Sequence, residues 1–263
     1  MNNPVLPIAC ELIKITKESQ TEWTFRVKTD IKVTHGQFIQ LSIPKIGEVP
    51  ISVSSSGADW LEFTIRAVGK VTDEIFALKP GDTIFLRGPY GNSWPLEQLK
   101  GKNIVVIAGG TGFAPVKSLL NYLYDNDTYA ASVNLIIGFR NENCIIFKDM
   151  VKKFSKKFNT IYTLDNGTAP NFKNGLVTKF IPDIPWKSFK DNYEVIIVGP
   201  PIMMHFASLE CLKNNVKEEK IWMSFERKMS CAIGKCGHCR IDETYVCLEG
   251  PIFNYTKAKE LVD

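Results

Sequence analysis

The chain has 263 residues, of which 44% are hydrophobic and 23% are charged, and this balance excludes a largely disordered protein. Its 32 basic and 28 acidic residues leave a formal net charge of +4, too small a surplus to indicate a nucleic-acid partner. The longest apolar runs have the length of strands, so we expect no membrane span. Because no secretory signal is visible at the N-terminus, we expect a cytoplasmic protein.

The first hundred residues predict a β-barrel. Short runs of β-branched and aromatic residues recur between turn signals such as Lys79-Pro80-Gly81-Asp82, a pattern that favours a closed barrel. The six expected strands are Glu11–Ile15, Trp23–Val27, Gln37–Ile43, Ile51–Ser54, Leu61–Ala67 and Thr83–Arg87. One short helix is expected at Thr72–Leu78. We therefore expect a first domain over residues 1–100.

From Gly101 the pattern changes, because strands begin to alternate with helices. The expected strands are Asn103–Ala108, Val133–Gly138, Thr160–Leu164, Glu194–Val198 and Lys220–Ser224. The expected helices are a run ending near Tyr124 and the segments Phe147–Phe158, Val177–Ile181 and Met203–Asn214. This alternation predicts a parallel, doubly wound, Rossmann-like α/β domain over residues 101–223, followed by a small tail over residues 224–263.

Two glycine-containing turns follow apolar strands, at the carboxyl ends where open α/β sheets bind ligands. The first, Gly109-Gly110-Thr111-Gly112, opens a helix, and its glycines would let a pyrophosphate approach the backbone. The second is Gly199-Pro200-Pro201, with Met203 two positions later. Each pattern alone also fits a simple strand-to-helix turn. The strand–glycine–helix context favours a nucleotide site.

Cysteines carry the strongest signal. Four of the seven lie within seventeen positions near the C-terminus, at Cys231, Cys236, Cys239 and Cys247. The C-x4-C-x2-C run with a fourth cysteine is typical of plant-type [2Fe–2S] sites, and Gly234 and Gly237 would let the loop curl. Structural zinc, which also takes four thiolates, is the alternative. The other three are expected to be small core residues, namely Cys10, Cys144 and Cys211.

A barrel, a nucleotide domain and a cysteine tail, in this order, resemble the ferredoxin–NADP reductase superfamily, specifically its branch with a C-terminal [2Fe–2S] tail. That branch includes electron-transfer subunits of dihydroorotate dehydrogenase, gamma subunits of sulfhydrogenases and B subunits of anaerobic sulfite reductases. Three segments resemble the sulfite reductase subunits most, namely Asn3–Pro7, Val49–Ser54 and Ser224–Cys231.

The resemblance implies a subunit that takes hydride from NADH to FAD and passes single electrons through a [2Fe–2S] cluster to a partner. The implied partners are iron–sulfur and sirohaem subunits of a sulfite reductase. An electron-transfer subunit of dihydroorotate dehydrogenase or sulfhydrogenase is the alternative, and a zinc-stapled nucleotide-binding protein is the non-redox alternative. We expect no acid–base catalytic residue in this chain.

Flavin-binding residues are also implied by the resemblance. The family's flavin motif falls on Val49-Pro50-Ile51-Ser52, followed by Val53. Val49 replaces the phosphate-binding arginine and Ile51 replaces the flavin-stacking aromatic residue. The second flavin element matches Gly69 and Thr72, and Thr72 is expected to cap the short helix and bind the FAD pyrophosphate. Arg66 is the candidate replacement for the missing positive charge.

Nucleotide choice depends on two residues that follow strands. Asp165 would accept hydrogen bonds from ribose hydroxyls and repel a 2′-phosphate, whereas Arg140 would attract that phosphate. The resemblance favours NADH over NADPH. Four basic residues flank the cysteines and either dock an acidic partner or are ordinary solvated charges: Arg227, Lys228, Lys235 and Arg240.

Overall fold

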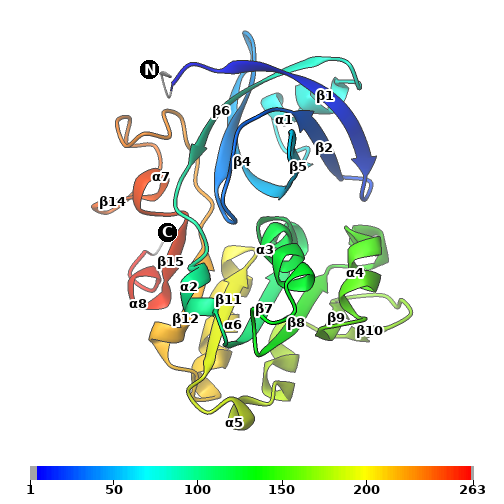
Figure 1. The fold of residues 1–263 in the computed structure, drawn as a ribbon, viewed down its shortest axis with the longest axis vertical. Coiled ribbons are helices and arrows are strands. Elements are labelled where there is room, and N and C mark those ends of the chain that lie inside the picture. The colour runs from blue at the N-terminus through cyan, green and yellow to red at the C-terminus, as the bar shows by residue number, and fades with distance from the viewer. Residues whose placement is uncertain (1–4, 262–263) are drawn as a thin grey trace.

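The computed structural model describes residues 5–261, so Asn3 and Pro4 of the opening segment lie outside the described residues. A barrel lies above a layered α/β domain, and the C-terminal tail runs along one side of both (Figure 1). Within residues 5–261 no helix combines the length and the apolar character that a membrane crossing requires.

Six strands form the expected closed barrel, in the order β1-β2-β5-β4-β3-β6. Their bounds are β1 Ile8–Lys17, β2 Glu22–Lys28, β3 Phe38–Ile43, β4 Gly47–Ser56, β5 Trp60–Arg66 and β6 Thr83–Tyr90. The short helix α1 (Lys70–Ala77) lies between β5 and β6. Because successive strand residues point to opposite faces, Val49 and Ile51 of β4 pack towards the barrel interior, and Pro50 and Ser52 face outward.

Seven strands form the second sheet, in the order β10-β9-β8-β7-β11-β12-β15. They are β7 Asn103–Gly109, β8 Ser132–Phe139, β9 Asn159–Leu164, β10 Phe172–Asn174, β11 Tyr193–Val198, β12 Ile221–Ser224 and β15 Ile252–Asn254. All pair in parallel except β15, which is antiparallel to β12. The expected doubly wound sheet is therefore confirmed, with one antiparallel edge strand.

Helices cover both faces of this sheet. On one face lie α3 (Phe113–Asp125) and α4 (Lys148–Phe154), and on the other α6 (Pro201–Lys213) and the 3-10 helix η3 (Val177–Asp183). Helix α4 is shorter than expected, because Phe147 has the left-handed φ of 54° and Ser155 already ends the helix. The short helices α2 (Leu96–Leu99) and α5 (Trp186–Phe189) and the 3-10 turns η2 (Glu142–Cys144) and η4 (Glu218–Lys220) lie in connections.

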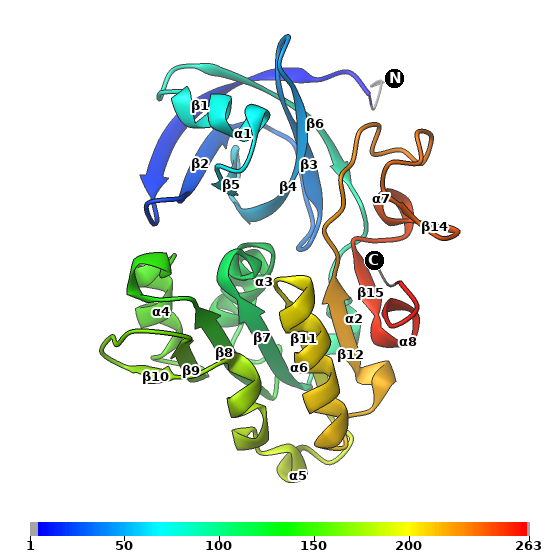
Figure 2. The same ribbon diagram turned by 180° about the vertical axis from the view of Figure 1, so that it is seen from behind.

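Residues 225–261 return to the nucleotide sheet rather than forming a detached unit. A small hairpin, β13 (Arg240–Ile241) and β14 (Thr244–Tyr245), is followed by α7 (Val246–Glu249), β15 and α8 (Tyr255–Ala258). Met223 of β12 pairs with Phe253 of β15, and Figure 2 shows the two strands side by side at the sheet edge. The expected domain division between residues 223 and 224 stays a prediction, and the sheet extends across it.

A buried charge cluster joins the two large domains. Glu62 of β5 accepts hydrogen bonds from Lys117 of α3, at 2.9 Å, and from Arg26 of β2, at 2.7 Å. Both Glu62 and Lys117 are buried. A second link runs from the backbone amide of Phe147 to the carboxylate of Glu18, at 2.9 Å. The barrel and the nucleotide domain are therefore held by specific polar contacts.

Candidate functional site

A cleft of about 1180 Å³ opens between the barrel and the carboxyl ends of the sheet strands. The barrel contributes Thr21, Glu22 and Arg66 to its lining. From the nucleotide domain come both glycine-containing turns and the ends of β8 and β9. This is the ligand-binding edge of an open α/β sheet.

The two glycine motifs pack directly against each other at the floor of the cleft. A side chain at Gly109 would place Cβ 2.4 Å from the Met203 sulfur. At Gly112, Cβ would lie 2.5 Å from the backbone oxygen of Val198 and 2.7 Å from the Gly199 Cα. These glycines are therefore required for close packing between the motifs. Gly110 differs, because it has a left-handed φ of 55° and open space on its Cα.

Only some of the residues predicted to bind a nucleotide line the cleft. Six of them line it, namely Gly109, Gly110, Thr111, Asp165, Pro200 and Met203. Gly112, Gly199 and Pro201 are outside the lining, and the first two lie in the packed contact between the motifs. Gly109, Gly110 and Thr111 are thus placed at the cleft, and a contact of Gly112 with a nucleotide stays a prediction.

Asp165 and Arg140 both line the cleft, at the ends of neighbouring strands. Burial raises the pKa of Asp165 above its usual value, and the nearby Arg140 charge opposes that rise. A carboxylate and a guanidinium therefore share the region where the sequence predicts selection between NADH and NADPH. Which of them contacts a ribose stays a prediction.

The flavin motif lies on β4, whose outer face carries Pro50 and Ser52. Cross-strand pairing places Gln40 of β3 opposite Pro50, so these side chains share that face. Within residues 5–261 the buried Oε1 atom of Gln40 has no hydrogen-bond partner. An acceptor left without a donor in a buried site costs free energy, and a donor on a bound flavin would satisfy it. The residues of this face therefore fit a flavin.

Two predicted flavin contacts are already used within the protein. The Val53 amide donates to the Gln37 carbonyl at 3.0 Å, and the Val53 side chain is buried in the barrel. The Thr72 hydroxyl accepts from the amides of Val68 and Gly69 and donates to the Gly69 carbonyl. These bonds orient the hydroxyl towards the turn at Gly69, and its contact with a pyrophosphate stays a prediction. The first amides of α1 precede the helix's internal hydrogen bonds and still present donors.

The positive charge of Arg66 already forms an ion pair within the protein. Its guanidinium donates to the buried carboxylate of Glu22 at 2.5 Å while lining the cleft. Ser19 and Thr21 hydroxyls donate to the same carboxylate. Burial alone would raise the pKa of Glu22, but these hydrogen bonds and the Arg66 charge more than offset it, so the pKa lies below its usual value. Arg66 is thus oriented by Glu22 at the cleft wall, and its contact with a flavin phosphate stays a prediction.

Backbone amides in the cysteine loop point at its sulfur atoms. The Lys235 amide lies 3.3 Å and the Cys236 amide 3.4 Å from the Cys231 sulfur, and the Gly234 amide lies 3.2 Å from the Cys247 sulfur. Left-handed φ angles of 70° at Gly234 and 79° at Gly237 allow the loop to curl. Amide donors stabilise sulfur ligands that carry negative charge.

The four thiols differ in exposure. Cys239 and Cys247 are buried and Cys236 is exposed. Burial, together with Cys239, raises the pKa of Cys247 to about 12, and hydrogen bonds from the loop backbone lower the pKa of Cys236 to about 7. In the described part of the chain, no three Cys, His, Asp or Glu side chains are grouped around one point as a single-ion site. Four cysteine thiols, with amide donors aimed at the sulfurs of Cys231 and Cys247, fit the donor set of a [2Fe–2S] cluster.

The three isolated cysteines have different surroundings. Cys10 and Cys211 are buried in hydrophobic cores, as expected. Cys144 is half-buried, packs against the core beneath α3 and α4 and also lines the cleft, so it is a core residue only in part. Sequence analysis also missed Gln40 and the Lys117–Glu62 link. Both depend on contacts between segments far apart in the chain, and neither belongs to a local motif.

Comparison with known proteins agrees with this site. Residues 106–209 match the oxidoreductase NAD-binding domain family, and residues 226–259 match the iron–sulfur cluster binding domain of dihydroorotate dehydrogenase B. Sulfhydrogenase 1 subunit gamma of Pyrococcus furiosus is 35% identical over 90% of this chain and 82% of its own. This chain belongs to the ferredoxin–NADP reductase-like family with an iron–sulfur tail. The family consists of NAD(P)H-dependent flavin and iron–sulfur oxidoreductase subunits, and its cofactors are the expected NADH, FAD and [2Fe–2S] cluster.

Other relatives of this reductase-like subunit extend the comparison. A probable dihydroorotate dehydrogenase B (NAD(+)) electron transfer subunit of Pyrococcus furiosus is 31% identical over 91% of this chain and 85% of its own. The solved structure of an NADH-dependent reduced ferredoxin–NADP oxidoreductase, described for flavin-based electron bifurcation, is 25% identical. It covers 97% of this chain and 89% of its own with a TM-score of 0.78. These relatives match the alternative that the sequence left open better than they match a sulfite reductase subunit.

Proposed function

We propose that this chain is the electron-transfer subunit of a multi-subunit oxidoreductase, with NADH, FAD and a [2Fe–2S] cluster in sequence. Flavin supplies the conversion between a two-electron hydride donor and a one-electron acceptor. The observation that supports this order is the position of β4. Helix α3, which follows the first glycine turn, packs against β4, and Gln40 beside β4 lies 3.5 Å from the Met229 carbonyl of the cysteine loop.

The proposed tasks of the residues follow from their positions. Gly110 and Thr111 present backbone to a pyrophosphate in the cleft, and Asp165 accepts from a ribose hydroxyl. Ser52 and Gln40 contact the flavin from the outer face of the barrel. Cys231, Cys236, Cys239 and Cys247 hold the cluster.

The partner is proposed to be a catalytic subunit of the sulfhydrogenase or dihydroorotate dehydrogenase type, because full-length relatives carry those names. The exposed Cys236 marks the side from which electrons leave. Lys235, next to Cys236 in the chain, and Lys228, earlier in the same tail, are exposed, which favours an acidic partner surface. The sulfite reductase assignment rests on the resemblance of three segments.

Anaerobic purification tests the cofactor proposal. Flavin, iron and acid-labile sulfide are measured per chain, and the visible spectrum is followed while NADH is added. We expect one flavin, two irons and two sulfides per chain, with bleaching of both chromophores by NADH. A colourless protein that contains zinc would contradict the proposal.

The partner is identified by isolating the native complex and assaying three NAD(H)-linked activities in parallel. Hydrogenase or dihydroorotate dehydrogenase activity would support the proposed partner class. Sulfite reductase activity alone would overturn it in favour of the assignment from the sequence.

A further inference from the structure

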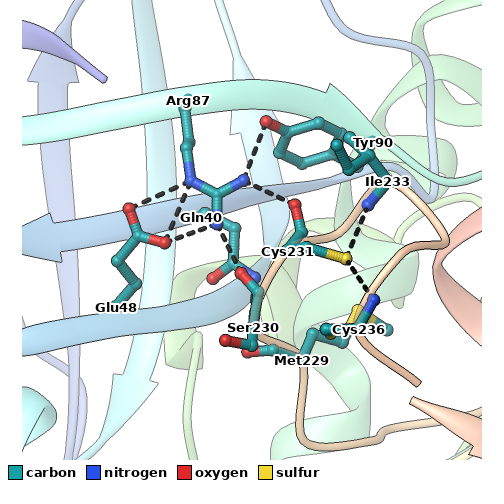
Figure 3. Close-up of polar contacts among 9 residues, drawn as sticks. All are labelled: Gln40, Glu48, Arg87, Tyr90, Met229, Ser230, Cys231, Ile233 and Cys236. Atoms are coloured by element: carbon teal, nitrogen blue, oxygen red, sulfur yellow. Dashed lines mark hydrogen bonds and ion pairs between the residues drawn. The ribbon is translucent and has the colours of Figure 1, made fainter. Parts of the chain in front are cut away.

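One guanidinium connects the barrel to the cysteine loop. Arg87 of β6 is 5% exposed, and its Nε lies 3.0 Å from each carboxylate oxygen of Glu48. Nη1 donates to the Tyr90 hydroxyl at 3.0 Å and to the Cys231 carbonyl at 2.8 Å. Nη2 donates to Glu48 and, at 2.5 Å, to the Ser230 carbonyl. Figure 3 shows this arrangement.

Every N–H group of Arg87 is used in these contacts. A guanidinium has five donors, and they are divided among one carboxylate, one phenol and two main-chain carbonyls. The two carbonyls belong to the predicted cluster ligand Cys231 and to the residue before it. The backbone that carries this ligand is therefore held at two adjacent points by a buried side chain of the barrel.

The same contact reaches the proposed flavin face. Arg87 is paired across the sheet with Gln40, and Gln40 with Pro50, so one row of the barrel surface runs from the cysteine loop to the flavin motif. Glu48 lies on the flavin strand itself, two residues before Pro50. A shift of Arg87 would therefore change the position of the loop relative to that motif.

The charges of this pair are balanced. Although burial opposes it, the hydrogen bonds to Glu48 and Tyr90 raise the pKa of Arg87 above its usual value, so the guanidinium stays protonated. Glu48 is partly exposed, at 28% for its side chain. Removal of Arg87 alone would leave a carboxylate without its countercharge close to the cysteine loop.

We propose that Arg87 is a positioning residue for the iron–sulfur cluster, which fixes the Cys231 backbone against the flavin strand, and that Glu48 neutralises its charge there. The inference rests on the proposed function, because it takes Cys231 as a cluster ligand. The iron content of the wild-type protein tests that assignment separately.

The test compares Arg87→Met with the double variant Arg87→Met/Glu48→Gln in the full chain. Two quantities are measured: the rate of iron loss to a chelator and the reduction potential of the cluster. Loss of a group that orients a metal ligand costs about 10- to 100-fold in metal affinity, so we expect both variants to lose iron at least about tenfold faster. The potential of the single variant should become more negative, because Glu48 then disfavours added electrons, and should return towards the wild-type value in the double variant.

Arg26→Met is the matched control. Arg26 is another barrel arginine that donates through Nε and Nη2 to a carboxylate, that of Glu62. Neither of these hydrogen bonds involves the cysteine loop. We expect it to leave iron loss and cluster potential at wild-type values. If Arg87→Met does not fold, Arg87→Lys keeps the charge and loses the fork, and should show faster iron loss with an unchanged potential.

A wild-type protein with iron, combined with Arg87 variants that retain wild-type iron loss and potential, would overturn the positioning role while leaving the proposed function intact. A wild-type protein without iron after reconstitution would instead overturn the cluster assignment itself.

Discussion

Replacement of Lys117 by methionine should weaken the junction between the two large domains. Lys117 and Glu62 are in contact at 2.9 Å, and both side chains are largely buried. At an effective dielectric constant of about 20, their gross attraction is about 6 kcal/mol, much of which offsets the cost of removing both charges from water. Breaking such a buried pair costs about 3–5 kcal/mol. Because Arg26 remains to compensate Glu62, we expect a loss of about 3 kcal/mol in the free energy of unfolding.

The cost should depend on pH. Burial alone would raise the pKa of Glu62, but Lys117 and Arg26 more than offset it and lower the pKa below the usual 4.5. A carboxylate with a lowered pKa in the folded state stabilises the protein above the unfolded pKa, and this stabilisation is lost as the pH falls through the folded value. The difference between wild type and Lys117→Met should therefore be full at pH 7 and shrink below about pH 4.5.

Urea unfolding at pH 7 and at a pH below about 4.5 measures the free energy of unfolding of wild type and Lys117→Met, with Lys153→Met as the control. Lys153 lies 4.4 Å from the Tyr124 ring, much as Lys117 lies 4.5 Å from the Phe147 ring, and 3.6 Å from the Asp125 carboxylate. Unlike Lys117 and Glu62, Asp125 is exposed and Lys153 is partly exposed. Exposed pairs contribute about 0–1 kcal/mol. Equal losses for the two lysine variants, or a Lys117 effect that does not change with pH, would refute the reasoning.

Three further predictions concern the cofactor sites. Gly112→Ala should destabilise the protein by about 1–3 kcal/mol and abolish flavin reduction by NADH in a stopped-flow assay, because its Cβ meets backbone atoms of Val198; normal NADH kinetics would contradict this. Asp165→Ser should raise the ratio of kcat/KM for NADPH over NADH by about tenfold, which corresponds to about 1.4 kcal/mol, and an unchanged ratio would exclude Asp165 from nucleotide selection. Cys239→Ser should remove the cluster iron in an iron assay while Cys211→Ser, at a buried core thiol, retains it.

The architecture could be predicted from the sequence because local patterns determine it. The period-two alternation of Leu61–Arg66 indicated a strand, and the short β-branched run before Gly109, which ends at a glycine turn, indicated another. Helix ends were less accurate. Helix α4 begins one residue later than expected, at Lys148, because Phe147 has a left-handed backbone conformation. The segment η3 is a 3-10 helix that contains Pro182, whose missing N–H disfavours an α-helix.

The site was predictable only in part. Local pattern identified the four cysteines by their spacing and the two glycine turns by the apolar strands that precede them. It could not show that Gly112 is needed for contact with Val198, because that contact joins segments that are distant in the chain. Nor could a motif show that the Thr72 hydroxyl is already hydrogen-bonded to the backbone of Gly69. Arg87 gave no signal, since two of its partners are backbone carbonyls, which any sequence supplies, and Glu48 and Tyr90 form no motif with it.

Strand β15 has a consequence for the tail as a whole. It is three residues long and covers β12, and strands left uncovered at a sheet margin offer free amides and carbonyls to other chains. Strand β15 is itself the edge strand of this sheet, so the tail replaces the edge of β12 with another short one. Deletion of the tail and removal of its metal are for this reason two different perturbations, because only deletion exposes the backbone amides and carbonyls of β12.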